Sequence, residues 1–458
     1  MAHQQPDLFS SSESLLSEEV NPDLSVATQP AKNGNINKVR AEDSSVHDWY
    51  RFVLSFPPHL VRDYLEKFGI TKRQTVLDPF CGTGTTLVEC KKLQIASVGV
   101  EANPMAHFAS EVKTDWSPEP RDLLRHADRI AADVRATLEV DGFYESLELF
   151  ELPKNGRPLN KLSDEKQKLL LTDSISPVPL HKTLTLLERI GRSRNSRSLK
   201  HELLAVAKAL TCAISNLHFG PEVGVSKPKL DAPVVSAWLD NVKSIADDLG
   251  VHRENFVKTT VRHADSRDLL KVLRPNSIDA IITSPPYPNE KDYTRTTRLE
   301  SVLLGFIGTK DDLRRLKQGL VRSNTRNVYK QDQDDAFIND NSKIQAIANE
   351  IESRRIELGK TSGFERMYAR VTKLYFGGMK KHLVDLRRIL RPGAQLAYVV
   401  GDQASYLQVM IRTGELLAEI AESLGYEVVN IDLFRTRRAT ATREQLREEV
   451  VLLRWRGA

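Results

Sequence analysis

The sequence has few cysteines and no long apolar run. Its three cysteines, Cys81, Cys90 and Cys212, form no CxxC pair, and no histidines cluster at ligand spacing. A disulfide framework and a metal site are therefore not expected. No run reaches the about eighteen apolar residues of a membrane span, and the N-terminus is polar and acidic, unlike a secretory signal. We expect a cytoplasmic protein with reduced thiols and no membrane contact.

Charge is distributed unevenly along the chain. Residues 1–45 carry seven acidic and three basic side chains, although the whole chain has a net charge of +5. Residues 1–44 are polar without a sustained apolar period, which predicts a disordered acidic leader. The remaining chain is long enough for one large α/β domain with insertions, or for two domains.

Basic side chains form three local clusters in this remaining part. They are Arg189, Arg192, Arg194, Arg197 and Lys200; Arg314, Arg315, Lys317, Arg322, Arg326 and Lys330; and Arg435, Arg437, Arg438, Arg443 and Arg447. Each cluster could follow a phosphate backbone, and each could equally be a solvated helix face.

A glycine-rich turn with the sequence DPFCGTGTT occupies residues 78–86, within a strand, turn, helix and strand predicted over 75–101. Gly82 and Gly84 permit a tight turn and a close ligand approach at the carboxyl edge of a parallel sheet. Glu101 follows at about the 20-residue spacing of an acid that accepts hydrogen bonds from ribose hydroxyls. The pattern predicts a nucleoside cofactor, and the lack of a third glycine argues against a dinucleotide.

A second motif, IDAIITSPPY, occupies residues 278–287. An apolar strand leads directly into the turn, where two prolines fix consecutive φ angles. Such a turn can aim the Ser284 hydroxyl, a backbone carbonyl and the Tyr287 ring into one pocket, which suits a flat ring with an amino group. A purely structural proline turn is the alternative, and the presence of the first motif in the same chain favours the site.

Together these motifs resemble those of the DNA amino-methyltransferases, which modify cytosine N4 or adenine N6. DPFCGTGTT resembles their cofactor motif, and TSPPY resembles their catalytic motif in the form usual for cytosine N4 enzymes. HDWYRFVLSFPPHL at 47–60 resembles the segment that covers the methionine end of the cofactor, and Asp265 resembles the acid that binds its adenine. LRRILRPG at 386–393 resembles the downstream helix and turn. The resemblance covers roughly residues 47–115 and 258–456.

The resemblance implies an α/β fold: a doubly wound, mostly parallel, seven-stranded Rossmann-like methyltransferase sheet with a largely helical insertion. The catalytic domain would comprise 45–115 and 259–458. Residues 116–258 would be the insertion and the candidate target-recognition region, with 309–362 as a second candidate.

The resemblance also implies S-adenosylmethionine as cofactor, double-stranded DNA as partner and site-specific methylation of cytosine N4 in restriction and modification of DNA. It leaves open a cognate restriction endonuclease as a second partner. The cofactor would be bound by Asp78, Phe80, Gly82, Gly84, Glu101 and Asp265, and the catalytic residues would be Ser284, Pro285, Pro286 and Tyr287.

The chemistry requires that the lone pair of an exocyclic amino nitrogen be localised and held near the methyl group. Ser284 Oγ and the Pro285 carbonyl are candidates to accept the amino hydrogens, and Tyr287 would stack on the flipped base. Carbon methylation would need a thiolate, usually after a proline, and no cysteine here follows one. Adenine N6 remains an alternative target. So does guanine N2 of tRNA, although Ser284 replaces the aspartate of that motif, and so does a non-catalytic nucleic-acid binder.

Overall fold

The computed structural model describes residues 40–51, 55–144, 158–192, 197–219, 223–289, 291–438 and 445–457. Its main sheet consists of β1 (Thr75–Asp78), β2 (Ala96–Glu101), β5 (Thr259–His263), β6 (Ile278–Thr283), β7 (Leu390–Gly401), β8 (Glu427–Arg438) and β9 (Gln445–Trp455). The helices are α1 (Pro58–Lys67), α2 (Thr85–Lys92), α3 (Pro104–Lys113), α4 (Pro120–Val140), α5 (Asp164–Gln167), α6 (Pro177–Arg192), α7 (Leu199–Ala209), α8 (Val234–His252), α9 (Tyr293–Thr296), α10 (Arg298–Leu303), α11 (Lys310–Gln318), α12 (Ser342–Glu357), α13 (Tyr368–Leu386) and α14 (Thr413–Ser423).

The seven strands have the order β5-β2-β1-β6-β7-β9-β8. All neighbours from β5 to β7 are parallel, and β9 runs antiparallel to both β7 and β8. The order reverses at β1, so ligands are expected at the carboxyl ends of β1 and its neighbours. This arrangement confirms the predicted fold class.

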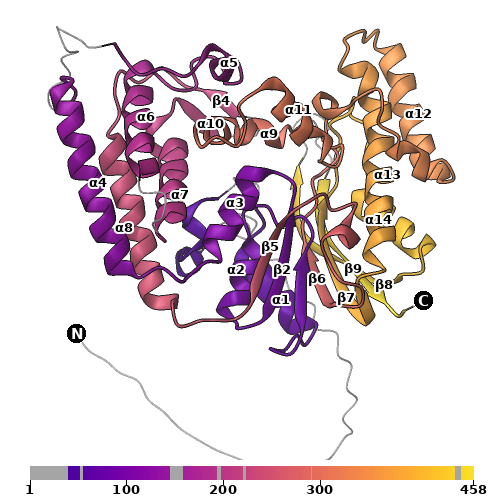
Figure 1. The fold of residues 1–458 in the computed structure, drawn as a ribbon. Helices are drawn as coiled ribbons and strands as arrows, with labels where there is room; N and C mark the ends of the chain where they lie inside the picture. The colour runs from indigo at the N-terminus through magenta and orange to yellow at the C-terminus, as the bar shows by residue number, and fades with distance from the viewer. Residues whose placement is uncertain are drawn as a thin grey trace, which may run out of the picture.

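Both faces of the sheet are buried because apolar residues occupy both sides of each central strand. In β7, Leu396, Tyr398 and Val400 pack on α13 and α14. Ala397 and Val399 point to the opposite face, toward α1 and α2. The sheet is therefore the middle of three layers (Figure 1).

The segment between β2 and β5 contains a group of helices beside the sheet (Figure 1). Helices α4, α6, α7 and α8 pack on one another and on α3, with Trp238 of α8 fully buried. A small antiparallel pair, β3 (Leu217–Phe219) and β4 (Val223–Val225), completes this part. The insertion thus has its own apolar core, which is continuous with the helix after β2.

The expected acidic leader at 1–44 lies outside the described residues except for its last five positions. There Asp43 is buried and its carboxylate lies 2.8 Å from the Arg62 guanidinium of α1. In the described part of the chain, no helix is both long and apolar enough to cross a membrane.

Candidate active site

A pocket of about 160 Å³ lies at the carboxyl ends of β1, β2, β5 and β6. Several segments far apart in the sequence line it, and a later stretch, 319–327, forms a wall. The lining residues are Ser55, Phe56, Pro79, Phe80, Cys81, Gly82, Thr83, Thr85, Glu101, Ala102, Asn103, Ala264, Ser266, Ser284, Pro285, Pro286, Tyr287, Tyr293, Gly319, Leu320, Val321, Ser323 and Asn327. The two sequence motifs therefore meet in one cavity.

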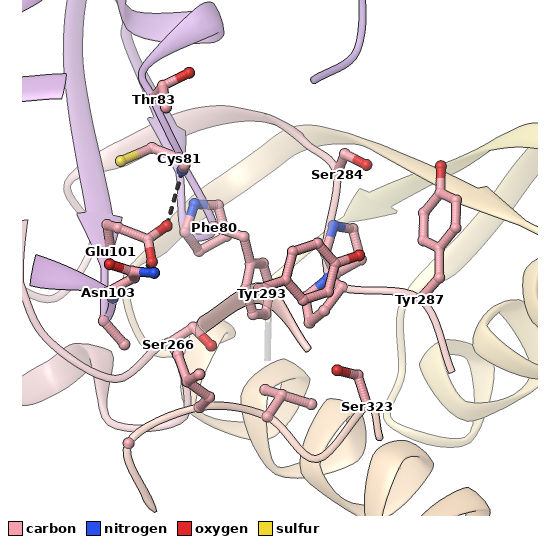
Figure 2. Close-up of a pocket in the computed structure, with 18 of the residues that line it drawn as sticks. Phe80, Cys81, Thr83, Glu101, Asn103, Ser266, Ser284, Tyr287, Tyr293 and Ser323 are labelled. Atoms are coloured by element: carbon pink, nitrogen blue, oxygen red, sulfur yellow. Dashed lines mark hydrogen bonds between the residues drawn. The ribbon is translucent and has the colours of Figure 1, made fainter. Parts of the chain in front are cut away.

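The pocket has two chemically distinct ends. Figure 2 shows Glu101 and Asn103 on one side and Ser284 and Tyr287 on the other, with Tyr293 between them. The first side is formed by the turns after β1 and β2, and the second by the proline turn after β6.

Glu101 is the acidic group of the first end. Its carboxylate accepts the backbone N–H groups of Gly82 at 2.8 Å and Asn103 at 2.7 Å, which fixes it across the glycine turn. Burial nevertheless raises the pKa of Glu101 to about 7, and the nearby Asp78 contributes in the same direction. A hydroxyl donor or a positively charged group next to Glu101 would therefore stabilise the charged form of its carboxylate.

Thr83 and the N-terminus of α2 add polar groups to the same end. The Thr83 side chain is 2% exposed, and its hydroxyl has no hydrogen-bond partner among the described residues. Thr85 begins the helix, whose free N–H groups and dipole favour a carboxylate. This end therefore offers an acceptor, an unpartnered hydroxyl and an anion-binding helix terminus.

Three residues expected at the cofactor are not among the residues that line the pocket: Asp78, Gly84 and Asp265. Gly84 has φ +86°, and a Cβ there would lie 2.9 Å from Ser110 Oγ, so its glycine is needed for the turn and for contact with α3. The Asp265 carboxylate is held by Arg267, with Nη2–Oδ2 2.6 Å and Nε–Oδ1 2.9 Å. Its neighbours Ala264 and Ser266 line the pocket instead.

Asp78 is fully buried under the two motif turns. Its Oδ1 accepts the Thr283 hydroxyl at 2.6 Å and the Phe80 N–H at 3.1 Å. Burial raises the pKa of Asp78 to about 6. The residue thus joins the end of β1 to the end of β6.

All four expected catalytic residues, Ser284 to Tyr287, line the second end. The Ser284 hydroxyl donates its hydrogen to the Val399 carbonyl of β7 at 3.1 Å, which leaves the lone pairs of Oγ available as acceptors. The Tyr287 ring packs on Gly401, where a Cβ would lie 3.1 Å from the ring. β7 therefore orients both side chains.

The wall at 319–327 is held by two buried arginines. Arg322 forms a bidentate ion pair with Asp332 (2.9 and 2.8 Å) and donates to the carbonyls of Lys317, Gln318 and Leu320. Arg267 donates to the same Gln318 carbonyl at 3.2 Å and pairs with Asp334 at 2.5 Å. These contacts connect the loop after β5 to the wall.

The segment expected over the methionine end reaches the pocket through Ser55 and Phe56, whereas residues 52–54 lie outside the described residues. The residues before the gap, 46–49, are held by hydrogen bonds to α8 and α2. Asp248 of α8 accepts the Val46 N–H and the Trp49 indole N–H, each at 2.7 Å. His47 is buried and lies 2.7 Å from the Glu89 carboxylate.

Comparison with known proteins finds similarity to DNA methyltransferases. A model of the N6/N4 class described as "DNA methylase" matches residues 25–111, which contain the glycine-rich turn. The Type II methyltransferase M.BsoBI of Geobacillus stearothermophilus is 26% identical over 440 residues, covering 90% of this chain and 85% of that protein. The chain is thus similar to DNA amino-methyltransferases, in the region of the glycine-rich turn by the family model and over most of its length by this relative.

Two further relatives match different lengths of this chain. The Type II methyltransferase M.AvaI of Nostoc is 24% identical over 433 residues, or 86% of this chain and 82% of its own. M.MjaII of Methanocaldococcus jannaschii is 37% identical over only 68 residues, 15% of this chain and 13% of its own.

Several residues that line the pocket were not predicted from the sequence: Thr83, Asn103, Ser266, Tyr293, Ser323 and Asn327. Asn103 had a signal, because an asparagine before Pro104 is typical of a helix N-cap, and its Oδ1 does cap α3. Tyr293 follows the proline turn closely in the chain. Asn327 lies 40 positions beyond Tyr287 and had no local signal.

Proposed function

We propose that this protein is a site-specific Type II DNA methyltransferase that transfers a methyl group from S-adenosylmethionine to the exocyclic N4 of cytosine in duplex DNA. One observation carries the proposal: a single pocket joins the Glu101 end to a Ser284 end, where the serine hydroxyl is oriented as an acceptor. Both the full-length relatives are named Type II methyltransferases.

The residues of the first end fit this cofactor. Glu101 can accept hydroxyl hydrogens of a ribose, and the unpartnered Thr83 hydroxyl and the α2 N-terminus suit the charged groups of an amino acid. Phe80 and Ser266 would flank the nucleoside. When bound, S-adenosylmethionine supplies a methyl group attached to a positively charged sulfur.

At the second end, Ser284 Oγ and the Pro285 carbonyl hold hydrogens of the target amino group. This draws electron density toward the nitrogen and directs its lone pair at the methyl carbon. An N–C bond forms as the S–C bond breaks, the sulfonium becomes a thioether, and the surplus proton leaves the amino nitrogen to water. Tyr287, held against Gly401, would stack on the flipped base.

Serine at 284 supports cytosine over adenine. Its hydroxyl is a shorter and uncharged acceptor compared with an aspartate, and it suits an amine that needs little help in losing its proton. The neighbouring Tyr287 and Tyr293 are not ionised bases, because burial raises their pKa values, that of Tyr293 to about 12.

Target recognition is proposed for residues 116–258, with 309–362 as the second candidate. The pocket lining includes five residues of 309–362 and none of 116–258. This position favours 309–362 for contacts next to the flipped base and leaves 116–258 for more distant parts of the DNA site.

The deciding experiment is nucleoside analysis of DNA from cells that express the protein. We expect N4-methylcytosine in this DNA. Ser284→Ala should keep cofactor affinity but lower the transfer rate on the order of a hundredfold or more in single-turnover kinetics, and cells that express it should contain less N4-methylcytosine. N6-methyladenine alone would overturn the choice of base. Transfer to tRNA but not to DNA would overturn the substrate class.

A further inference from the structure

Asn327 is a buried amide at the pocket with an unused acceptor. Its side chain is 1% exposed and lines the cavity, and its Oδ1 has no hydrogen-bond partner within the described residues. A buried amide oxygen without a partner is costly, so a donor that arrives with a ligand would stabilise it.

The wall places Asn327 at the base end of the pocket. Asn327 ends a short 3-10 turn, η5 (Thr325–Asn327), and the residue before this turn, Asn324, donates to the Lys291 carbonyl at 3.1 Å. Lys317 forms a buried ion pair with Asp292 at 3.1 Å and donates to the Arg326 carbonyl at 3.4 Å. Both contacts attach the turn to residues 291–292, which continue the catalytic loop after Tyr287.

An amide presents an acceptor and a donor side by side. Cytosine and adenine each carry an amino N–H next to a ring nitrogen with a free lone pair, which is the complementary arrangement. Ser284 Oγ and the Pro285 carbonyl can share the amino hydrogen on the other side in a three-centre hydrogen bond. An amide on this edge would therefore complete the hydrogen bonding of the amino group.

We propose that Asn327 binds the ring edge of the flipped base. Its Oδ1 accepts one hydrogen of the amino group that is methylated, and its Nδ2 donates to the adjacent ring nitrogen, N3 in cytosine. This rests on the proposed function, since it concerns the target base of the same reaction. Asn327 thereby fixes the orientation of the base edge in the pocket and selects a base with this donor and acceptor pair.

The test uses single-turnover methylation of duplexes that carry the sequence modified in cells. The target position holds cytosine, 3-deazacytosine, which lacks the N3 acceptor, or an abasic sugar. Asn327→Ala should lower the rate on cytosine about ten- to hundredfold, corresponding to the loss of hydrogen bonds to a base edge. Binding of S-adenosylmethionine and of the abasic duplex should stay unchanged, which shows that the variant is folded.

The modified base distinguishes a direct contact from a structural role. Wild type should lose rate on 3-deazacytosine, whereas Asn327→Ala should lose nothing further, because the contact is already absent. Asn327→Asp, nearly the same size, keeps an acceptor but lacks the donor, so it should be slow on cytosine and insensitive to the deaza substitution. Asn339→Ala, at an exposed asparagine of the same segment, should behave as wild type.

The inference is wrong if 3-deazacytosine lowers the methylation rate equally in wild type and in Asn327→Ala, or if Asn327→Ala methylates cytosine at the full rate. In both cases wild-type methylation of cytosine, and so the proposed function, would still stand. If wild type transfers no methyl group to cytosine, the proposed function itself fails.

Discussion

The Asp78 carboxyl group joins the two motif turns at the level of a single side chain. By accepting both the Thr283 hydroxyl and the Phe80 N–H, it fixes the turn after β1 relative to the strand that leads to Ser284. The two ends of the pocket are thus positioned by one buried residue that is not among the residues lining the pocket. A substitution there would disturb both ends together.

Glu101 should make cofactor binding depend on pH near neutrality. Burial raises the pKa of its carboxyl group to about 7, so the group binds a proton as the pH falls through that value. The protonated form lacks the charge that attracts the cationic cofactor. Affinity for S-adenosylmethionine, measured by calorimetry, should therefore be about half its maximum at pH 7, close to its maximum at pH 8, and about tenfold weaker at pH 6 than at pH 8.

Glu101→Gln is the matched control because it is isosteric and neutral throughout this range. It should bind the cofactor more weakly at pH 8 and show no change between pH 6 and pH 8. If the affinity of Glu101→Gln for the cofactor still changes between pH 6 and pH 8, the proton binds to another group. Asp78 is one such group, because burial raises its pKa to about 6.

The secondary-structure elements that could be predicted are those marked by a pattern within a short stretch of sequence, such as an apolar run or a glycine-rich turn. β1, α2 and β2 follow from a buried apolar strand, a glycine turn and a second strand within 75–101, and β6 follows from the apolar run before Ser284. Because parallel strands end at one edge, the two motifs could be expected to meet there. The pocket contains both.

The remaining site depends on contacts that no local pattern encodes. Asp265 has the position of an adenine-binding acid, but its carboxylate is held by an arginine two residues later, which is in turn fixed by Asp334. The wall residues Ser323 and Asn327 lie in a segment that Arg322 holds through Asp332 and two backbone carbonyls. The spacing of residues in the sequence does not show which of these groups meet, and the Arg267–Asp334 pair joins residues 67 positions apart.

Arg322→Met should release this wall from the sheet. Asp332 and several carbonyls would be left buried without their donor, and removing one partner of a buried ion pair costs about 3–5 kcal/mol. Amide hydrogen exchange should accelerate in residues 317–332, and methyl transfer should fall, while exchange in β1, β6 and β7 should stay slow.

Arg315→Met is the control, since Arg315 is exposed and pairs only across the helix surface with Asp312. It should leave the exchange of residues 317–332 unchanged. Unaltered exchange in Arg322→Met as well would mean that the wall is held by other contacts.

At the scale of the whole molecule, the sheet lies between the helical insertion and the α12–α13 region, with α9, α10 and α11 above one end (Figure 1). The basic clusters on the two sides differ in their partners. Arg189, Arg192 and Lys200 of the insertion side lie within ion-pair distance of Asp133, Glu188 and Glu111. Near the pocket wall, Arg314 lies over Tyr329 and Arg326 over Phe364.

This difference predicts which side contacts the DNA backbone. Arg314, Arg326 and Lys330 are exposed, and none forms a salt bridge with another described residue, so they are free to bind phosphates beside the pocket. Replacing all three by alanine should weaken duplex binding and reduce the slope of log K against log salt by about 2–3. The slope measured at several salt concentrations reports the number of phosphates contacted. The matched triple, Arg192→Ala, Arg197→Ala and Lys200→Ala, should leave the slope unchanged. A reduced slope in this second triple alone would place the phosphate backbone along this basic cluster of the insertion and not beside the pocket wall.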